Sequence, residues 1–189
     1  MVQSSVVSDA RNVLLARIVE HVAANGLADT SLRELADEVG TSHRMLNYHF
    51  GGRDGLVAAI VRSTEAGQRE ALAELGRSAA TPEQVIRTQW EQLTRPELAP
   101  VIRLFFELFA LALAGRPGTD GFLDDITEPW LAVASEVGAE LGIEVDRVEL
   151  RLGVAVLRGL LVEALAAGDP TEAGESLERY LEMWAASRA

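Results

Sequence analysis

The sequence has no cysteine and no lysine among its 189 residues, and only 5% of the residues are aromatic. The lack of cysteine excludes disulfide bonds, a thiolate nucleophile and a cysteine-based zinc site. No apolar run reaches the roughly 18 to 20 residues that a membrane-spanning helix needs, so we expect no membrane partner. The first nine residues lack a basic start and a long apolar core. We therefore expect no secretory signal peptide and a cytoplasmic location.

The net charge of −12 is distributed unevenly along the chain. Residues 1–62 contain six arginines, seven acidic residues and all three histidines, whereas the remainder contains eleven arginines and twenty-two acidic residues. The first segment is close to neutral, so it can carry a local basic surface for nucleic acid. Phosphates would repel the acidic remainder, and we therefore expect weak non-specific binding to DNA.

Two short helices with a glycine corner between them are predicted from residue 31 onward. Ser31 and Glu34 have the spacing of a capping box, and apolar residues recur after them at helical spacing. Gly40 can take the left-handed conformation that ends a helix, and Ser42 can cap the next helix. This pattern predicts a helix-turn-helix unit.

The second of these helices is expected from His43 to about Tyr48. A helix of this length is not stable alone, so buried side chains must hold it, and we expect Leu46 and Phe50 to do so. No acidic residue occurs between residues 40 and 53. Arginine pairs with guanine and asparagine with adenine in bidentate geometry, so the helix suits a DNA major groove.

The same stretch resembles the DNA-binding domain of the tetracycline-repressor (TetR) family of bacterial transcription regulators. The family pattern reads T-S-L-R-x-I-A-x-x-x-G-V-S-x-x-x-L-Y-x-H-F, then a small residue, Lys or Arg, an acid and Leu. The residues that carry the likeness are Thr30, Ser31, Leu32, Arg33, Glu34, Leu35, Ala36, Gly40, Ser42, Leu46, Tyr48, His49, Phe50, Arg53, Asp54 and Leu56. The likeness begins near Arg11, and the rest of the chain has the family's length.

Two positions depart from the family pattern. Asn47 stands where the family has tyrosine, and Thr41 stands where it has valine. The first departure leaves open which side chain contacts a phosphate, and Tyr48 is a candidate.

The resemblance implies a DNA-binding surface that has two kinds of contact. The residues expected to contact bases are His43, Arg44 and Asn47. Those expected to anchor phosphates are Thr30, Ser42, Tyr48, His49 and Arg53, and the surface is completed by Ser31, Arg33 and Thr41.

The remaining segments also predict helices, and strand signals are weak, so the expected fold class is all-α. A helix capped by Ser8 or Asp9 should follow a mobile arm and end near residue 25. Further helices are expected at 53–75, 81–94, 101–114, 122–141 and 146–167, with a last one after residue 170. Within 122–141, Pro129 either kinks the helix or marks its start. We expect a helix-turn-helix DNA-binding domain at 1–52, a connecting helix at 53–75, and a ligand-binding and dimerisation domain at 76–189.

A mostly apolar ligand pocket is a hypothesis for the C-terminal part. Its expected lining residues are Trp90, Phe105, Phe109 and Trp130, each of which could instead be ordinary core. Glu107 could form a surface ion pair with Arg103, or it could face the pocket and neutralise a cation. The expected effector is a small apolar or cationic molecule.

The helix at 146–167 has two separate apolar faces. One face can pack in the core of its own subunit, while the other needs a partner or complete burial within one chain. The predicted dimer residues are Leu152, Ala155, Gly159 and Val162, with Leu177, Leu181 and Trp184 from the last helix. We expect a homodimer whose interface contains two helices from each subunit, as the resemblance also implies.

The sequence and the resemblance together predict a ligand-responsive transcription regulator, a repressor that a small molecule releases from a palindromic operator. The alternative is a helical dimer that senses a ligand or a protein and no longer binds DNA. An enzyme is not expected, because cysteine is lacking and the three histidines lie within the predicted DNA-binding unit. No cofactor and no metal site are expected.

Overall fold

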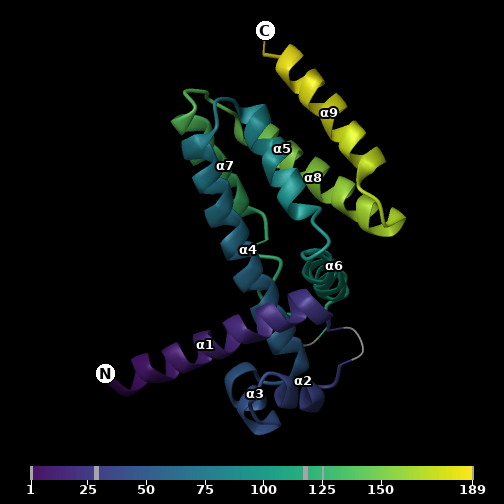
Figure 1. Cartoon of the computed structure of the whole chain (residues 1–189). Coiled ribbons are helices and arrows are strands. Elements are labelled where there is room, and N and C mark those ends of the chain that lie inside the picture. Colours follow the sequence, from purple (N-terminus) through teal and green to yellow (C-terminus); the bar gives the residue numbers. More distant parts are fainter. Residues whose placement is uncertain (1, 28–29, 117–118, 125, 189) are drawn as a thin grey trace. The chain divides into compact units, whose positions relative to one another are not determined.

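The computed structural model describes residues 2–27, 30–116, 119–124 and 126–188, with side chains from residue 10 onward (Figure 1). Within these residues it contains nine α-helices and no strand, which confirms the all-α prediction. The helices are α1 (Val2–Asn25), α2 (Leu32–Glu38), α3 (His43–Phe50), α4 (Arg53–Ser78), α5 (Pro82–Leu93), α6 (Ala99–Leu113), α7 (Glu128–Glu140), α8 (Arg147–Ala167) and α9 (Thr171–Ala186).

The chain divides into two compact units. Unit 1 comprises Met1–Ala66 and Pro100–Leu123, and unit 2 comprises Gly67–Ala99 and Asp124–Ala189. Helix α4 therefore contributes its first part to unit 1 and its second part to unit 2.

Unit 1 has a core to which α1, α2, α3 and α4 each contribute. Its fully buried side chains include Ile18, Val22, Leu35, Leu46, Leu56, Ile60 and Val61. Because α2 and α3 are too short to persist alone, this shared core is what keeps them helical.

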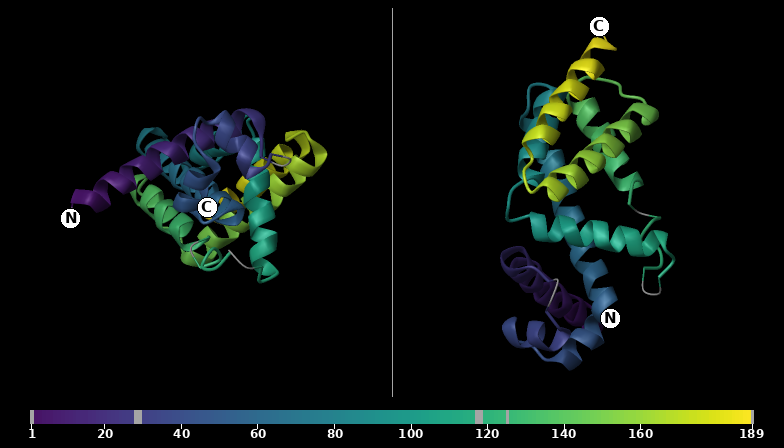
Figure 2. Two further views of the ribbon diagram at one scale, coloured as in Figure 1. Left: turned by 90° about the horizontal axis from the view of Figure 1, so that it is seen from below. Right: turned by 90° about the vertical axis from the view of Figure 1, so that its right-hand side faces the viewer.

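Unit 2 contains a closely packed pair, α8 and α9, in which α9 folds back along α8 (Figures 1 and 2). Gly168 ends α8 in the left-handed conformation, and Leu177 and Leu181 of α9 are each only 1% exposed. Elsewhere in this unit, α4 and α7 approach so closely that a Cβ on Gly76 would lie 2.7 Å from Val137 Cγ2. Glycine thus permits close packing of these two helices.

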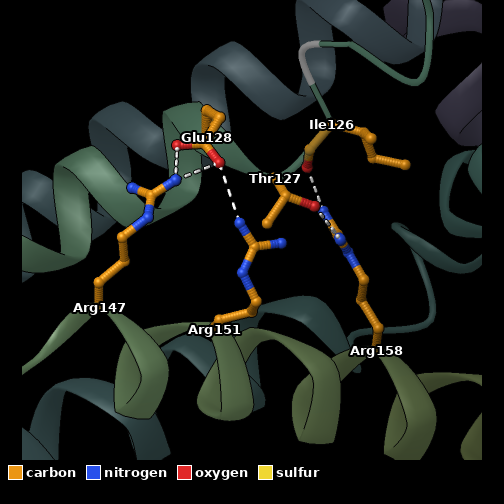
Figure 3. Close-up of polar contacts among 6 residues, drawn as sticks. All are labelled: Ile126, Thr127, Glu128, Arg147, Arg151 and Arg158. Atoms are coloured by element: carbon orange, nitrogen blue, oxygen red, sulfur yellow. Dashed lines mark hydrogen bonds and ion pairs between the residues drawn. The ribbon is translucent and has the colours of Figure 1, made fainter.

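Polar contacts fix the start of α7 against α8 (Figure 3). Glu128 accepts hydrogen bonds from Arg147, at 2.6 Å to Oε2, and from Arg151, at 3.0 Å to Oε1. The bond from Arg147 lowers the pKa of the Glu128 carboxyl, and the same bond raises the pKa of Arg147. Arg158 donates to Thr127 Oγ1 at 3.0 Å and to the carbonyl of Ile126. One side of α8 is therefore held by its own subunit.

The starts of two helices differ most from the sequence predictions. Helix α1 begins at Val2, so the predicted start at Ser8 or Asp9 is wrong. No glycine or proline interrupts the preceding residues, which leaves the helix free to extend. Helix α7 begins at Glu128 and not at Phe122, and Pro129 lies in its first turn. Proline lacks the N–H that an interior turn requires, so it marks a start here and not a kink.

The close approach between α3 and α4 predicts different outcomes at two glycines of α4. A Cβ on Gly55 would overlap the backbone carbonyl of Phe50, whereas a Cβ on Gly67 would meet nothing within 4 Å. We expect Gly55→Ala to lower the free energy of unfolding by about 1–3 kcal/mol. The matched control Gly67→Ala should raise it by about 0.5–1 kcal/mol, because alanine favours a helix. Urea denaturation measures both, and a Gly55→Ala protein as stable as the parent would contradict the packing described.

Candidate nucleic-acid interface

The first helix of the predicted unit starts at a complete capping box. The backbone N–H of Glu34 donates to Ser31 Oγ at 3.2 Å, and the N–H of Ser31 donates to Glu34 Oε2 at 2.8 Å. The backbone bond from Ser31 is the main cause that holds the pKa of Glu34 below its ordinary value. The predicted cap is confirmed, and Gly40 follows the helix with a φ of 66°.

Helix α3 has defined ends and a buried underside. Ser42 is its N-cap and accepts the N–H of Met45 at 3.2 Å, as predicted. Gly51 closes the helix with a φ of 75°, so α3 ends at Phe50, two residues after the predicted end. Leu46 and Phe50 are 1% and 7% exposed, which confirms that they hold the helix.

The opposite side of α3 is a polar surface exposed to solvent. His43, Arg44, Asn47 and Tyr48 are all exposed, and His49 is half-buried. The first four lie at positions i, i+1, i+4 and i+5, which share one helix face. Asn47 Nδ2 lies 3.1 Å from His43 Nε2, and the Tyr48 and His49 ring centroids are 5.0 Å apart. The structure therefore brings the three predicted base-contacting residues together with Tyr48.

Arg53 is bound to the backbone that precedes α2. Its guanidinium donates to the carbonyl of Leu27 at 2.8 Å and to the carbonyl of Thr30. The predicted phosphate anchors Arg53 and Thr30 thus contact each other. These bonds connect α4 to Leu27 and Thr30, which is a structural role that the sequence did not reveal.

Two further arginines, which sequence reasoning did not select, also donate to carbonyls in unit 1. Arg17 donates to the carbonyl of Val39, at the end of α2. Arg11 Nε donates to the carbonyl of His49 at 3.3 Å, and its guanidinium carbon lies 5.1 Å from the centre of the Phe50 ring. Helix α1 therefore stabilises the carboxyl ends of both α2 and α3.

The charged side chains that α2 presents have mixed signs. Arg33 is exposed, and so are Asp37 and Glu38. Glu38 Oε2 lies 2.9 Å from Nε2 of His21, which is half-buried on α1. Helix α3, by contrast, carries Arg44 and no acidic residue.

The residues predicted for the ligand pocket occupy both units. Phe105 and Phe109 on α6 belong to unit 1, where their rings stack with centroids 6.1 Å apart. Glu107 is exposed on the same helix. In unit 2, Trp90 is buried on α5, and the Arg69 guanidinium carbon lies 5.7 Å from the Trp130 ring centre. The pocket stays a prediction.

The residues predicted for the dimer interface separate into exposed and buried groups. On α8, Leu152, Ala155, Gly159 and Val162 are all exposed. On α9, Leu177 and Leu181 are buried within this chain, and Trp184 is half-buried with the Arg188 guanidinium carbon 5.2 Å from its ring centre. Because buried side chains cannot contact a partner, we reassign Leu177 and Leu181 to the core.

In the part of the chain that the structure describes, no helix combines the length and apolar character needed to span a bilayer. The same residues contain no group of three or more histidine and acidic side chains placed to hold a metal ion.

Comparisons with known proteins relate these observations to a family. Residues 14–60 match the family of bacterial regulatory proteins described as the tetR family. A TetR-family transcriptional regulator from Pectobacterium atrosepticum has the same fold, with a TM-score of 0.70, 22% identity, and coverage of 95% of this chain and 94% of that chain. A search of curated proteins found no significant match.

Two other solved structures have the same fold. A member of the TetR family from Streptomyces coelicolor is 26% identical, covers 89% of this chain and 96% of that chain, and has a TM-score of 0.56. Thermus thermophilus FadR, a TetR-family repressor in complex with lauroyl-CoA, is 20% identical, covers 92% of each chain, and has a TM-score of 0.60.

The hydrogen bonds from Arg53 to two backbone carbonyls predict that the planar shape of its guanidinium matters as well as its charge. Lysine keeps the charge but lacks the planar fork that reaches two carbonyls. We expect Arg53→Lys to lower the free energy of unfolding by about 1–2 kcal/mol, measured by thermal denaturation. The control Arg62→Lys, at an exposed position of the same helix, should change it little. If Arg53→Lys is as stable as the parent, and Arg53→Ala weakens DNA binding without lowering stability, then Arg53 acts through its charge on a phosphate. That outcome would contradict the structural role of its two backbone bonds.

Proposed function

We propose that the chain, whose residues 14–60 match the tetR family of bacterial regulatory proteins, is a homodimeric transcription repressor that a small molecule releases from a palindromic operator. DNA binding is assigned to residues 1–52, the connection to residues 53–75, and ligand binding and dimerisation to residues 76–189. In this proposal the protein acts in the cytoplasm and has no catalytic role.

The observation that carries this proposal is the exposed face of α3. It presents a guanidinium, a carboxamide, an imidazole and a phenol on one side of a helix whose other side is buried. Arg44 and Asn47 are side chains that read guanine and adenine edges in bidentate geometry. In this proposal they read base edges together with His43, while Ser42 and Tyr48 bind phosphates.

Dimerisation is proposed through the outer face of α8. Val148, Leu152 and Val162 are 75%, 55% and 46% exposed, although all three are large apolar side chains. Ala155 and Gly159 lie between them on the same face and would allow a partner helix to approach closely. A two-fold dimer places two copies of α3 on half-sites related by the same symmetry, which gives a palindromic operator.

Release by an effector is proposed to act through α4. This helix is continuous from Arg53 to Ser78 and contributes to both units, so it can transmit a change between them. The lauroyl-CoA complex of the FadR relative supports a small-molecule effector for the present chain. An effector that binds one conformation more tightly lowers operator affinity by that difference in binding free energy.

Selection of duplexes from a random library should return palindromic sites, and variants of α3 should alter their recognition. We expect Arg44→Ala and Asn47→Ala each to reduce discrimination at one base pair per half-site by about 1–3 kcal/mol. Tyr48→Phe should weaken all duplexes alike, since a lost phosphate contact carries no sequence information. Competition gel-shift assays with selected and scrambled duplexes measure both effects.

The alternative of a sensor that does not bind DNA makes a different prediction for this experiment. In that case the library yields no enriched site, and the three variants behave like the parent. If the library instead returns an asymmetric site whose binding depends on salt, DNA binding is supported, but recognition by a two-fold symmetric dimer is contradicted.

The exposed face of α8 predicts which substitutions separate the dimer. We expect Leu152→Glu to convert the dimer to monomer at micromolar concentration, because two carboxylates would be buried in an apolar interface. Val13→Glu is the matched control, since Val13 on α1 is 62% exposed and lies outside the proposed interface. Analytical ultracentrifugation measures the mass. A Leu152→Glu protein that remains dimeric would place the interface elsewhere.

A further inference from the structure

Among the described residues of unit 2, one buried polar side chain has no hydrogen-bond partner. Gln89 on α5 is 2% exposed, and neither Oε1 nor Nε2 has a hydrogen-bond partner among the described residues. Thr119, the other buried polar residue among those that the structure describes, belongs to unit 1 and donates to the carbonyl of Arg116 at 2.7 Å. Buried carboxamides normally have partners, so Gln89 requires an explanation.

The surroundings of Gln89 on its own helix are apolar. Val85 and Ile86 lie one turn before it, Trp90 follows directly, and Leu93 lies one turn after it. Val85 and Trp90 are buried, and Ile86 and Leu93 are half-buried. The carboxamide therefore lies on a stripe that contains Val85, Ile86 and Leu93, where a leucine or methionine would pack without an unpaired polar atom.

A second carboxamide in the same unit has a similar property. Gln68 belongs to the part of α4 that lies in unit 2, and its buried Oε1 also has no partner among the described residues. The interior of this unit thus offers neutral amide groups for hydrogen bonding. No charged side chain is buried among the described residues, so a charged ligand at this depth would remain unpaired.

We infer that Gln89 anchors the effector, and that the effector is a neutral molecule with adjacent N–H and C=O groups, such as a primary amide, a lactam or a cyclic imide. A carboxamide provides one acceptor and two donors, so it pairs with such a group through two parallel hydrogen bonds. The apolar stripe on either side accepts the hydrocarbon part of the molecule. This inference rests on the proposed function and narrows the expected effector to a neutral amide, since no charged side chain is buried among the described residues.

Four probes with the same six-carbon chain test the inference: hexanamide, hexanoate, hexylammonium and hexanol. We expect hexanamide to raise the melting temperature of the parent protein most and to release a selected duplex in a gel-shift assay. Gln89→Met should weaken hexanamide binding by about 10-fold to 100-fold, measured by calorimetry, and should leave hexanol binding unchanged.

Gln92→Met is the matched control, because Gln92 lies on the same helix and is half-buried without unpartnered buried atoms among the described residues. It should bind hexanamide like the parent. In the absence of any probe, Gln89→Met should also melt about 3–6 °C higher than the parent, since an unpaired buried amide has been removed. The Gln92→Met protein should melt like the parent.

The inference is overturned if hexanoate or hexylammonium binds as well as hexanamide, if Gln89→Met retains parental hexanamide affinity, or if no probe binds preferentially. The proposed function is tested separately by duplex binding without probes. Loss of amide preference with intact duplex binding contradicts the inference alone, whereas a parent protein that binds no duplex contradicts the proposed function.

Discussion

The structure depends on the burial of Leu46 and Phe50 beneath an eight-residue helix. A helix of two turns has too few internal hydrogen bonds to offset the cost of its nucleation. The core of unit 1 supplies the missing free energy by removing these two side chains from water, about 1.5–3 kcal/mol for each. Every polar residue on the exposed face of α3 is therefore positioned by packing on the opposite face.

The arginines of unit 1 show how this packing is reinforced. Arg11, Arg17 and Arg53 each donate to a backbone carbonyl at the end of a helix or in the segment before α2. Guanidinium groups used in this way orient α2 and α3. They also leave fewer cations for phosphates, which lowers the sequence-independent part of DNA affinity. A regulator of this composition would depend more on base contacts and on hydroxyl or backbone donors than on net positive charge.

Sequence patterns predicted the local features that a few neighbouring residues determine. Ser31 and Ser42 cap helices where their spacing predicted, because a capping side chain bonds to backbone only two or three residues away. The contacts of the arginines with distant carbonyls could not be predicted. Every residue has a backbone carbonyl, and the sequence does not show which one lies near a given arginine.

The sequence also could not show which helix covers the apolar face of α9. Helical spacing indicated that Leu177 and Leu181 share an apolar face, but it did not identify the neighbour that covers that face. In the structure α8 and α9 pack together within one chain, and both leucines are buried. The unpartnered face of α8 could be predicted because two apolar stripes on one helix cannot both face the same neighbour. The unpartnered carboxamide of Gln89 gave no signal, as a single glutamine is common on a helix of mixed polarity.

The face of α8 and the face of α3 are linked energetically in the proposed function. Two or three base contacts, each worth about 1–3 kcal/mol of discrimination, give one subunit limited specificity for a half-site. A dimer doubles the number of base contacts without lengthening α3. Once one subunit is bound, the other is held close to its half-site, so its binding is effectively intramolecular. In the proposed dimer, recognition by the short helix α3 would therefore depend on the exposed Val148 and Leu152 of α8, although they are distant from it in the sequence. Any conformational change that alters the spacing of the two α3 helices removes one set of base contacts at once, so a modest effector preference is enough to release DNA.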